Sequence, residues 1–193
     1  MKMKKRAYTL KKRAESQAET RQRIVEAAVD LHREFGPLRT SFSMVAERAG
    51  VQRHTLYAHF PDDRSLLMAC SGHNLEQNPR PSAELWKKIE DRDERLRVAL
   101  TELYAWYAKN EKMTANILRD LEISPVMQEI AKIRIAPFYK AYGEVLGEKL
   151  SAKQKPMLAL ALSFYSWRAL VREGGLSTSA AAQQMALSIA QAK

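Results

Sequence analysis

Apolar residues recur with helical spacing near the N-terminal end of the chain. The stripe consists of Ile24, Ala27, Ala28, Leu31 and Phe35. Counted from Ile24, its members stand at positions +3, +4, +7 and +11, which places them on one face of a helix. The stripe predicts an amphipathic helix over residues 19–35, and the following Gly36 and Pro37 end it.

Two short helices are expected directly after this one. The first starts at Ser41 or Ser43, runs to Ala49 and ends at Gly50, because glycine is the usual residue just past a helix end. The second covers residues 53–60 and ends at Pro61, which cannot continue a helix. Three helices separated by such short turns predict a compact helical unit.

The rest of the chain also has helical patterning. Asp62 and Asp63 supply an acidic cap and first turn for a helix that reaches about residue 77. The run Asn78–Pro81 then breaks the chain, and Gly174-Gly175 separates the last two helices. Further helices are expected over residues 83–89, 93–112, 114–121, 125–150, 152–173 and 178–192.

Composition agrees with an all-α protein. The chain has 193 residues, is 46% hydrophobic and contains 7 glycines and 7 prolines. Helix-favouring residue types dominate, and the apolar content suffices for a core. No stretch approaches the roughly 20 apolar residues of a membrane span or the apolar run of a signal peptide, and the one cysteine fits a reducing compartment. We expect a cytoplasmic protein without a membrane partner.

Charge is concentrated at the N-terminal end. The formal net charge is +10, and the first 13 residues carry seven cations and no acid. We expect residues 1–18 to be a disordered basic arm. Such an arm favours an anionic polymer, and equally fits a solvated tail that aids solubility.

The segment 42–61 has the pattern of a helix-turn-helix. Ala46 is small where the second helix must cross closely, and Gly50 permits the positive φ of the tight turn. Val45, Leu56 and Phe60 are the apolar residues that would lock the two short helices onto the first one. Residues 53–60 therefore become the candidate recognition helix.

Polar residues of that helix are the candidate DNA contacts. Arg53 is placed for a guanine, and His54 for a base edge. Thr55, Tyr57 and His59 are better placed for phosphates, as is Thr40 at the start of the preceding helix. The alternatives are packing of Tyr57 against the first helix and a surface or capping role for His59.

These motifs resemble the tetracycline-repressor (TetR) family. The run from Thr40 to Val51, TSFSMVAERAGV, is similar to the second-helix signature of that family, and Thr55 to Pro61, TLYAHFP, is similar to its recognition helix and exit. The resemblance covers about residues 20–70 in detail. It implies a helix-turn-helix domain at residues 19–65, followed by a helical ligand-binding and dimerisation domain at residues 66–193.

The resemblance also implies a mechanism. A dimer would bind a palindromic operator as a transcriptional regulator, by the family's default a repressor, and a small molecule would release it. Three features depart from the family pattern, and one of them is a basic arm longer than in many members, which fits a place in the minor groove. His54 replaces a small residue or proline, and Asp63 replaces a phosphate-binding lysine, whose contact Arg64 is expected to take over.

The C-terminal domain offers ligand and dimer candidates. The resemblance implies a small hydrophobic or aromatic ligand, for which the candidate contacts are Trp106, Met113, Phe138, Phe164 and Trp167, with Asn110, Asn116 and Arg119 as polar candidates. Aromatic residues at helical spacing also suit a plain core. The last two helices are apolar over much of their circumference, which predicts a homodimer through them, with burial inside a monomer as the alternative.

Two other classes of function were compared with this one. Catalysis is not expected, because the four histidines and Cys70 form no nucleophile, base or metal set and no glycine-rich phosphate loop is present. Neither a cofactor nor a metal is expected. A non-specific nucleic-acid-coating protein driven by the basic arm is the alternative, and sequence preference would separate the two.

Overall fold

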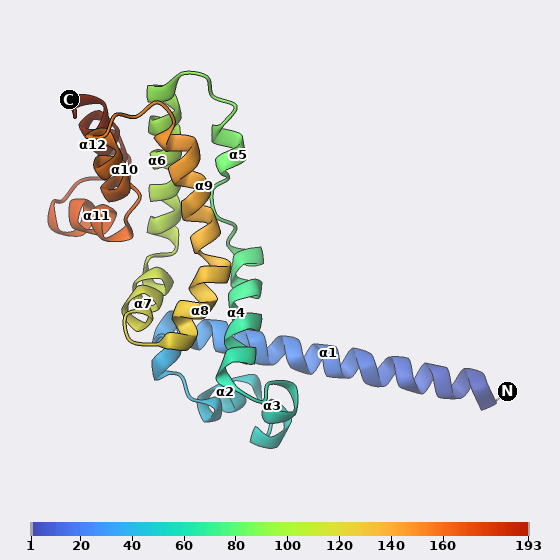
Figure 1. Ribbon diagram of the computed structural model, residues 1–193. Coiled ribbons are helices and arrows are strands. Elements are labelled where there is room, and N and C mark those ends of the chain that lie inside the picture. The colour runs from blue at the N-terminus through green and yellow to red at the C-terminus, as the bar shows by residue number, and fades with distance from the viewer. Residues whose placement is uncertain (1, 193) are drawn as a thin grey trace. The chain divides into compact units, whose positions relative to one another are not determined.

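A computed structural model describes residues 2–192 of the chain, and the side chains of residues 11–192. The described residues form helices and no strand (Figure 1), which confirms the all-α prediction. The chain divides into two compact units. The first runs up to Asn78 and includes Asn116–Ile130; the second comprises Pro79–Ala115 and the chain from Ala131 onward.

The first unit contains the three predicted N-terminal helices. Its elements are α1 (Lys2–Glu34), η1 (Pro37–Arg39), α2 (Phe42–Ala49), α3 (Arg53–His59) and α4 (Asp63–Gln77). The apolar stripe of α1 is buried against α2, α3 and α4, except for Phe35, which is 39% exposed. The stripe, with Val45, Leu56 and Phe60, therefore forms the core of the expected helix-turn-helix unit.

Helix α1 starts earlier than the amphipathic stripe. It continues back to Lys2, through the segment for which we expect a disordered arm. Residues 1–35 contain neither glycine nor proline and are rich in Lys, Arg, Glu, Ala and Gln, which lose little on entering a helix. Side chains 11–19 are exposed, so this part of α1 rests on helix propensity and not on packing.

The second unit is built from shorter helices. They are α5 (Ala83–Trp86), α6 (Arg92–Lys109), α9 (Ala136–Gly147), α10 (Gln154–Ala161), α11 (Phe164–Arg168), the π-turn η2 (Ala169–Glu173) and α12 (Thr178–Gln191). Helix α12 packs along α6 and α10. The division between the units passes through α7 (Glu111–Leu121) and α8 (Pro125–Arg134), each of which contributes residues to both.

Two helices that the sequence predicts as continuous are broken. The predicted helix 125–150 is interrupted at Ile135, because Pro137 lacks a backbone N–H and begins the new helix α9. The predicted helix 152–173 is interrupted at Ser163, whose side chain accepts the Tyr165 N–H and starts α11. Apolar periodicity continues across both breaks, which is why the pattern conceals them.

The chain's one cysteine lies in the core of the first unit. Cys70 of α4 is 3% exposed, and its thiol donates a weak hydrogen bond to the Val25 carbonyl. Burial raises the pKa of the thiol to about 12, so it stays protonated and unreactive at neutral pH. In the described part of the chain, no helix combines the length and apolarity that crossing a membrane requires.

Candidate nucleic-acid interface

The turn between α2 and α3 has the geometry that the sequence predicts. Gly50 adopts the left-handed conformation, with φ 64° and ψ 40°. Ala46 is 3% exposed, and its carbonyl accepts the Val51 N–H at 2.9 Å. The Ser41 side chain caps the start of α2 by accepting the Met44 N–H at 3.3 Å. These bonds fix the direction in which α3 leaves the turn.

Helix α3 is anchored by one face and presents the other. Leu56 is fully buried and Phe60, at its C-cap, is 1% exposed. Arg53 and His54 at its N-terminal end are exposed. The first turn has no side-chain cap from Gln52, so donors and backbone N–H groups lie together at this end. A recognition helix reads the major groove with such an end.

The remaining predicted contacts of α3 differ in exposure. Tyr57 is 45% exposed, and its ring lies 5.0 Å from that of Phe42, on α2 and not on the first helix. This contact, in which the ring planes are tilted by 40°, restrains the phenol and leaves it partly exposed. Thr55 and His59 are half-buried. The structure thus brings Arg53, His54 and Tyr57 together on the open face, with Thr55 and His59 at its margins.

Thr40 has a local partner. Its hydroxyl donates to the Gly36 carbonyl at 2.8 Å, and the neighbouring Ser41 acts as the cap. The hydroxyl oxygen keeps lone pairs but has used its proton, so any phosphate contact at this helix start would come from backbone N–H groups or from a rotated Thr40. The serine that caps α2 is signalled in the sequence by its position just before the apolar run.

Arg64 is held by an acid. Its Nε and Nη2 donate to Glu129 Oε1 at 3.1 and 2.6 Å, and both side chains are about half exposed. These hydrogen bonds lower the pKa of Glu129 and raise that of Arg64. A phosphate that binds Arg64 must therefore compete with Glu129, an acid 65 residues away that sequence reasoning did not find.

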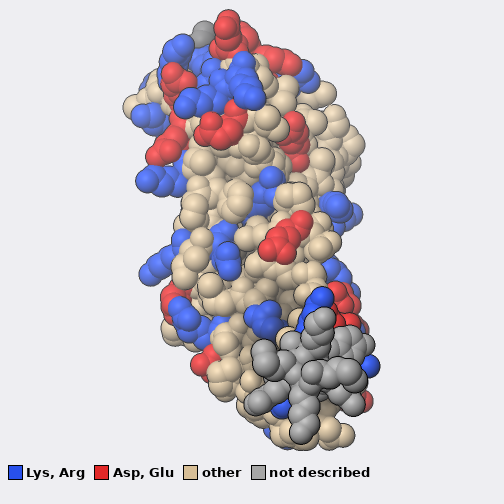
Figure 2. All heavy atoms as spheres, turned by 90° about the vertical axis from the view of Figure 1, so that its right-hand side faces the viewer, with Lys and Arg blue, Asp and Glu red and all other residues tan. Residues whose placement is uncertain are grey.

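Charges are mixed on the side of the molecule that Figure 2 draws. Figure 2 shows lysine and arginine side chains interspersed with acidic ones, and outside the grey residues no continuous basic band appears on the face drawn. The excess of cations in the sequence is not spread evenly, since seven stand in the first 13 residues. The side chains of residues 1–10 lie outside the described ones.

Three of the five predicted ligand contacts lie in one aromatic network of the second unit. Tyr107 is at its centre, with ring centroids 5.9 Å from Trp106, 5.5 Å from Phe164 and 5.9 Å from Trp167. The Tyr107 hydroxyl lies 2.7 Å from that of Tyr139 and donates to the Leu162 carbonyl. Burial raises the pKa of Tyr107, so the hydroxyl remains a donor.

The other two predicted aromatic and apolar contacts differ from each other. Phe138 lies on α9, and the Arg80 guanidinium carbon is 5.8 Å from its ring, which joins it to the network through Trp106. Met113 is 6% exposed in α7 and has no described contact to the network. Sequence reasoning missed Arg80 and Tyr139, because neither carries a signal in the periodicity.

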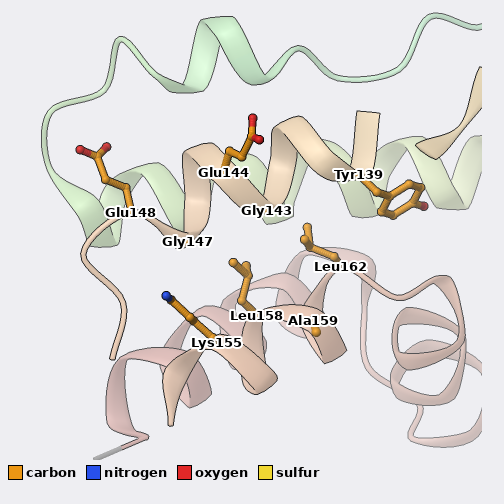
Figure 3. Close-up of a pocket in the computed structure, with 9 residues that line it drawn as sticks. All are labelled: Tyr139, Gly143, Glu144, Gly147, Glu148, Lys155, Leu158, Ala159 and Leu162. Atoms are coloured by element: carbon orange, nitrogen blue, oxygen red, sulfur yellow. The ribbon is translucent and has the colours of Figure 1, made fainter. Parts of the chain in front are cut away.

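A groove runs along α9 and α10 in the second unit. Its volume is about 640 Å³. Figure 3 shows Tyr139 at one end of the groove and Glu148 with Lys155 at the other. Leu158 and Leu162 line it with apolar surface. The groove is open and mixed in polarity, which suits a ligand with one charged end.

Two predicted polar ligand contacts have another role. Asn116 Nδ2 donates to the Arg33 carbonyl at 3.0 Å, and Arg119 Nη2 donates to the Phe35 carbonyl at 3.0 Å. Both residues thereby satisfy carbonyls that the end of α1 leaves free. Buried Asp120 accepts from Leu38 N–H at 2.9 Å and from Arg119 Nε at 2.7 Å. These side chains hold the end of α1, and Asn110 bonds the Trp106 carbonyl.

Metal chemistry has no support among the described side chains. No group of three or more potential His, Cys, Asp or Glu ligands is present there. His73 Nδ1 lies 3.4 Å from Gln22 Nε2, and Cys70 bonds the Val25 carbonyl, so the two do not act as a pair.

Comparison with known proteins gives one family match. Residues 24–70 match the family described as bacterial regulatory proteins, tetR family. No curated protein matches the chain by sequence. The matched range includes α2, the Gly50 turn and α3, the elements that carry the candidate DNA contacts.

Solved structures share the fold over most of the chain. A protein assigned to the TetR-family regulators, from Mesorhizobium loti MAFF303099, is similar with a TM-score of 0.65 and 15% identity, over 90% of this chain and 95% of that one. A protein assigned as a fatty acid metabolism regulator from Clostridium perfringens has a TM-score of 0.64 and 17% identity, covering 86% and 96%. FadR from Bacillus subtilis, in complex with stearoyl-CoA, has a TM-score of 0.62 and 16% identity, covering 89% and 98%.

Proposed function

We propose that this chain, whose residues 24–70 match the tetR family, is a ligand-released, dimeric repressor of transcription. The observation that carries its DNA-reading role is the open face of α3. Buried Leu56 and Phe60 fix the helix, while Arg53 and His54 are exposed at its N-terminal end. Arg53 pairs with guanine in this proposal, and Tyr57, Thr55 and His59 bind flanking phosphates.

The proposed dimer uses the last helices of the second unit. Leu160 of α10, Tyr165 of α11 and Leu187 of α12 are large apolar side chains that are 53%, 49% and 54% exposed. Exposed apolar side chains on neighbouring helices favour self-association. A two-fold dimer places two α3 helices against half-sites about 34 to 36 Å apart, one turn of DNA, which matches a palindrome.

The proposed effector is a small molecule bound by the second unit. The aromatic network around Tyr107 and the groove along α9 support this proposal. The stearoyl-CoA held by FadR supports an organic effector for a protein of this fold. The protein acts by binding and not by catalysis, and its place is the cytoplasm, where its DNA partner lies.

The test is selection of bound sequences from a randomised duplex library at fixed salt. The wild type is expected to enrich one palindrome, and Arg53→Ala to lose about 1 to 3 kcal/mol on that operator, with relaxed preference at one base pair of each half-site. Arg33→Ala is the matched control, because Arg33 is an exposed arginine of the same unit that is paired with Asp30.

Each outcome decides between the two functions. Enrichment that depends on Arg53 and not on Arg33 supports the operator reader. Retention of DNA without any enriched sequence, unchanged in both variants, would favour the coating protein driven by the basic arm and would end the operator proposal.

A further inference from the structure

Two nitrogens of the Arg80 guanidinium, in the second unit, are buried without a hydrogen-bond partner among the described residues. They are Nε and Nη1. Arg95 of the same unit shows the usual solution. Its nitrogens donate to the carbonyls of Ile89, Val145 and Glu90, and it pairs with Glu148 at 3.1 Å. Arg80 therefore differs from Arg95 in having two buried charged donors that make no hydrogen bond.

Aromatic rings surround this guanidinium in place of an acid. Its central carbon lies 4.3 Å from the Trp106 ring centroid and 5.8 Å from those of Phe138 and Tyr139. Cation–π contacts compensate a buried charge only in part, because they leave its N–H groups unused. A charge-assisted hydrogen bond to an anion is the stronger interaction. We call these four residues the Arg80 cluster.

Two further donors are unpartnered in the same aromatic network. The Tyr104 hydroxyl and the Trp167 Nε1 are buried without a hydrogen-bond partner. Both rings flank Tyr107, at 6.2 and 5.9 Å, and Tyr107 in turn contacts Trp106. Each of these groups is a hydrogen-bond donor, so the network contains more hydrogen-bond donors than acceptors.

We propose that the Arg80 cluster binds the anionic group of an organic effector whose flat apolar body packs on Trp106 and Phe138. This inference rests on the proposed function, because it names the class of molecule that releases the repressor. The four side chains of the cluster are half-buried, so a ligand approaches them from solvent and enters between the rings to reach the two buried nitrogens. Tyr139 also lines the groove along α9, so the cluster and the groove meet at this ring.

The charges of the groove orient such a ligand. Glu144 and Glu148 lie away from Tyr139 along the groove (Figure 3). Glu148 is paired with Arg95 and shares its end of the groove with Lys155, so the orientation rests on Glu144, which repels an anionic group, and on the guanidinium beside Tyr139, which attracts it. The anionic end of the ligand therefore belongs at the Tyr139 end, and the apolar body extends over the rings or toward Leu158.

The experiment is calorimetric titration of the DNA-free protein with three probes of one shape. These are 2-naphthoate, 2-naphthyl phosphate and the neutral 2-naphthamide. At least one of the two anions is expected to bind ten times more tightly than the amide, and the comparison of carboxylate with phosphate shows which anionic group the site takes. Arg80→Met should reduce the anion's affinity to that of the amide, and Arg80→Lys should keep part of the preference.

Controls separate this role from a structural one. Arg97→Met removes an exposed arginine of the same unit, paired with Glu94, and should leave all three affinities unchanged. Arg80→Met should unfold at the same temperature as the wild type or higher, because it removes an unpaired buried charge. A large fall in that temperature would overturn the proposal, because it would mean that the guanidinium has its partner inside the protein.

Three other results would also overturn it: equal affinities for anion and amide, an anion preference that survives Arg80→Met, and no binding of any probe at millimolar concentration. None of them touches the operator, because the titration contains no DNA. Loss of operator selection in the library experiment would instead contradict the proposed function while leaving a measured anion preference in place.

Discussion

The carboxylate of Glu129 and the guanidinium of Arg64 neutralise each other at the surface of the first unit. Arg64 follows the recognition helix by five residues and is the residue expected to replace the phosphate-binding lysine. Its availability to DNA therefore depends on a side chain that is not itself a DNA contact.

Replacing the acid should release the arginine. Glu129→Gln is expected to strengthen operator binding a few-fold and to steepen the salt dependence by about one unit of log–log slope, as one more phosphate contact would. Operator titrations at several salt concentrations measure both. Glu122→Gln removes an exposed acid of the same unit, so an identical gain there would mean that net charge, and not Arg64, is responsible.

His32 is a second residue with a consequence for the whole unit. It is 6% exposed, and burial lowers its pKa to about 4, against the opposing charge of Asp120. The folded protein thus keeps His32 neutral, while the unfolded chain takes up a proton as the pH falls below 6.5. Stability should be lost as the pH falls from 6.5 to 4 and should level off below that.

The expected loss is about 2 kcal/mol between pH 7 and pH 5. Denaturant unfolding at the two pH values measures it, with His32→Gln as the reference because glutamine does not titrate. If the variant loses as much stability as the wild type, other groups, and not His32, cause the acid sensitivity.

At the scale of elements, two glycines with positive φ mark the ends of α1 and α2. Gly36 has φ +97° and Gly50 has φ +64°. A Cβ at Gly50 would meet nothing within 4 Å, whereas one at Gly36 would overlap the Arg119 side chain and lie 2.8 Å from Asp120 Oδ2. An alanine at Gly50 would thus suffer backbone strain alone, whereas an alanine at Gly36 would suffer backbone strain and a steric clash.

Alanine variants at the two glycines should separate the cost of backbone strain from the cost of the steric clash. Gly50→Ala is expected to cost about 1 to 2 kcal/mol of unfolding free energy from the left-handed backbone, and Gly36→Ala about 1 to 3 kcal/mol more from overpacking. Denaturant unfolding compares them, with Gly50→Asn as a milder substitution. Equal losses for the two alanine variants would contradict the clash at Gly36.

The sequence predicts most of the first unit and less of the second. Helix-turn-helix residues are local in sequence, so the small Ala46, the left-handed Gly50 and the exposed Arg53 follow from spacing. Pairs such as Arg64–Glu129 join residues far apart in the chain and leave no trace in periodicity. The helix breaks at Ile135 and Ser163 do not appear in the sequence pattern either, because helical spacing of apolar residues continues through both of them.

At the scale of the whole molecule, the proposed dimer depends on exposed apolar side chains. Leu160→Glu combined with Leu187→Glu should convert the protein into a monomer at micromolar concentration, because two charges would have to be desolvated in the interface. Sedimentation velocity measures the change. Leu85→Glu alters a leucine of α5 that is 58% exposed, and should remain a dimer. A monomeric Leu85→Glu or a dimeric double variant would contradict the assignment of the interface.

Because the thiol of Cys70 is buried, the native protein presents no cysteine at its surface that reacts with sulfhydryl reagents. The protein therefore suits site-directed spin labelling. A cysteine introduced at exposed Ala58 of α3 would be the one thiol that reacts with the label. In the proposed symmetric dimer, one such substitution supplies both of the labels between which a distance is measured. The distance between the two α3 helices, with and without effector, can then be measured in solution as a distance distribution. No native residue of the core has to be replaced.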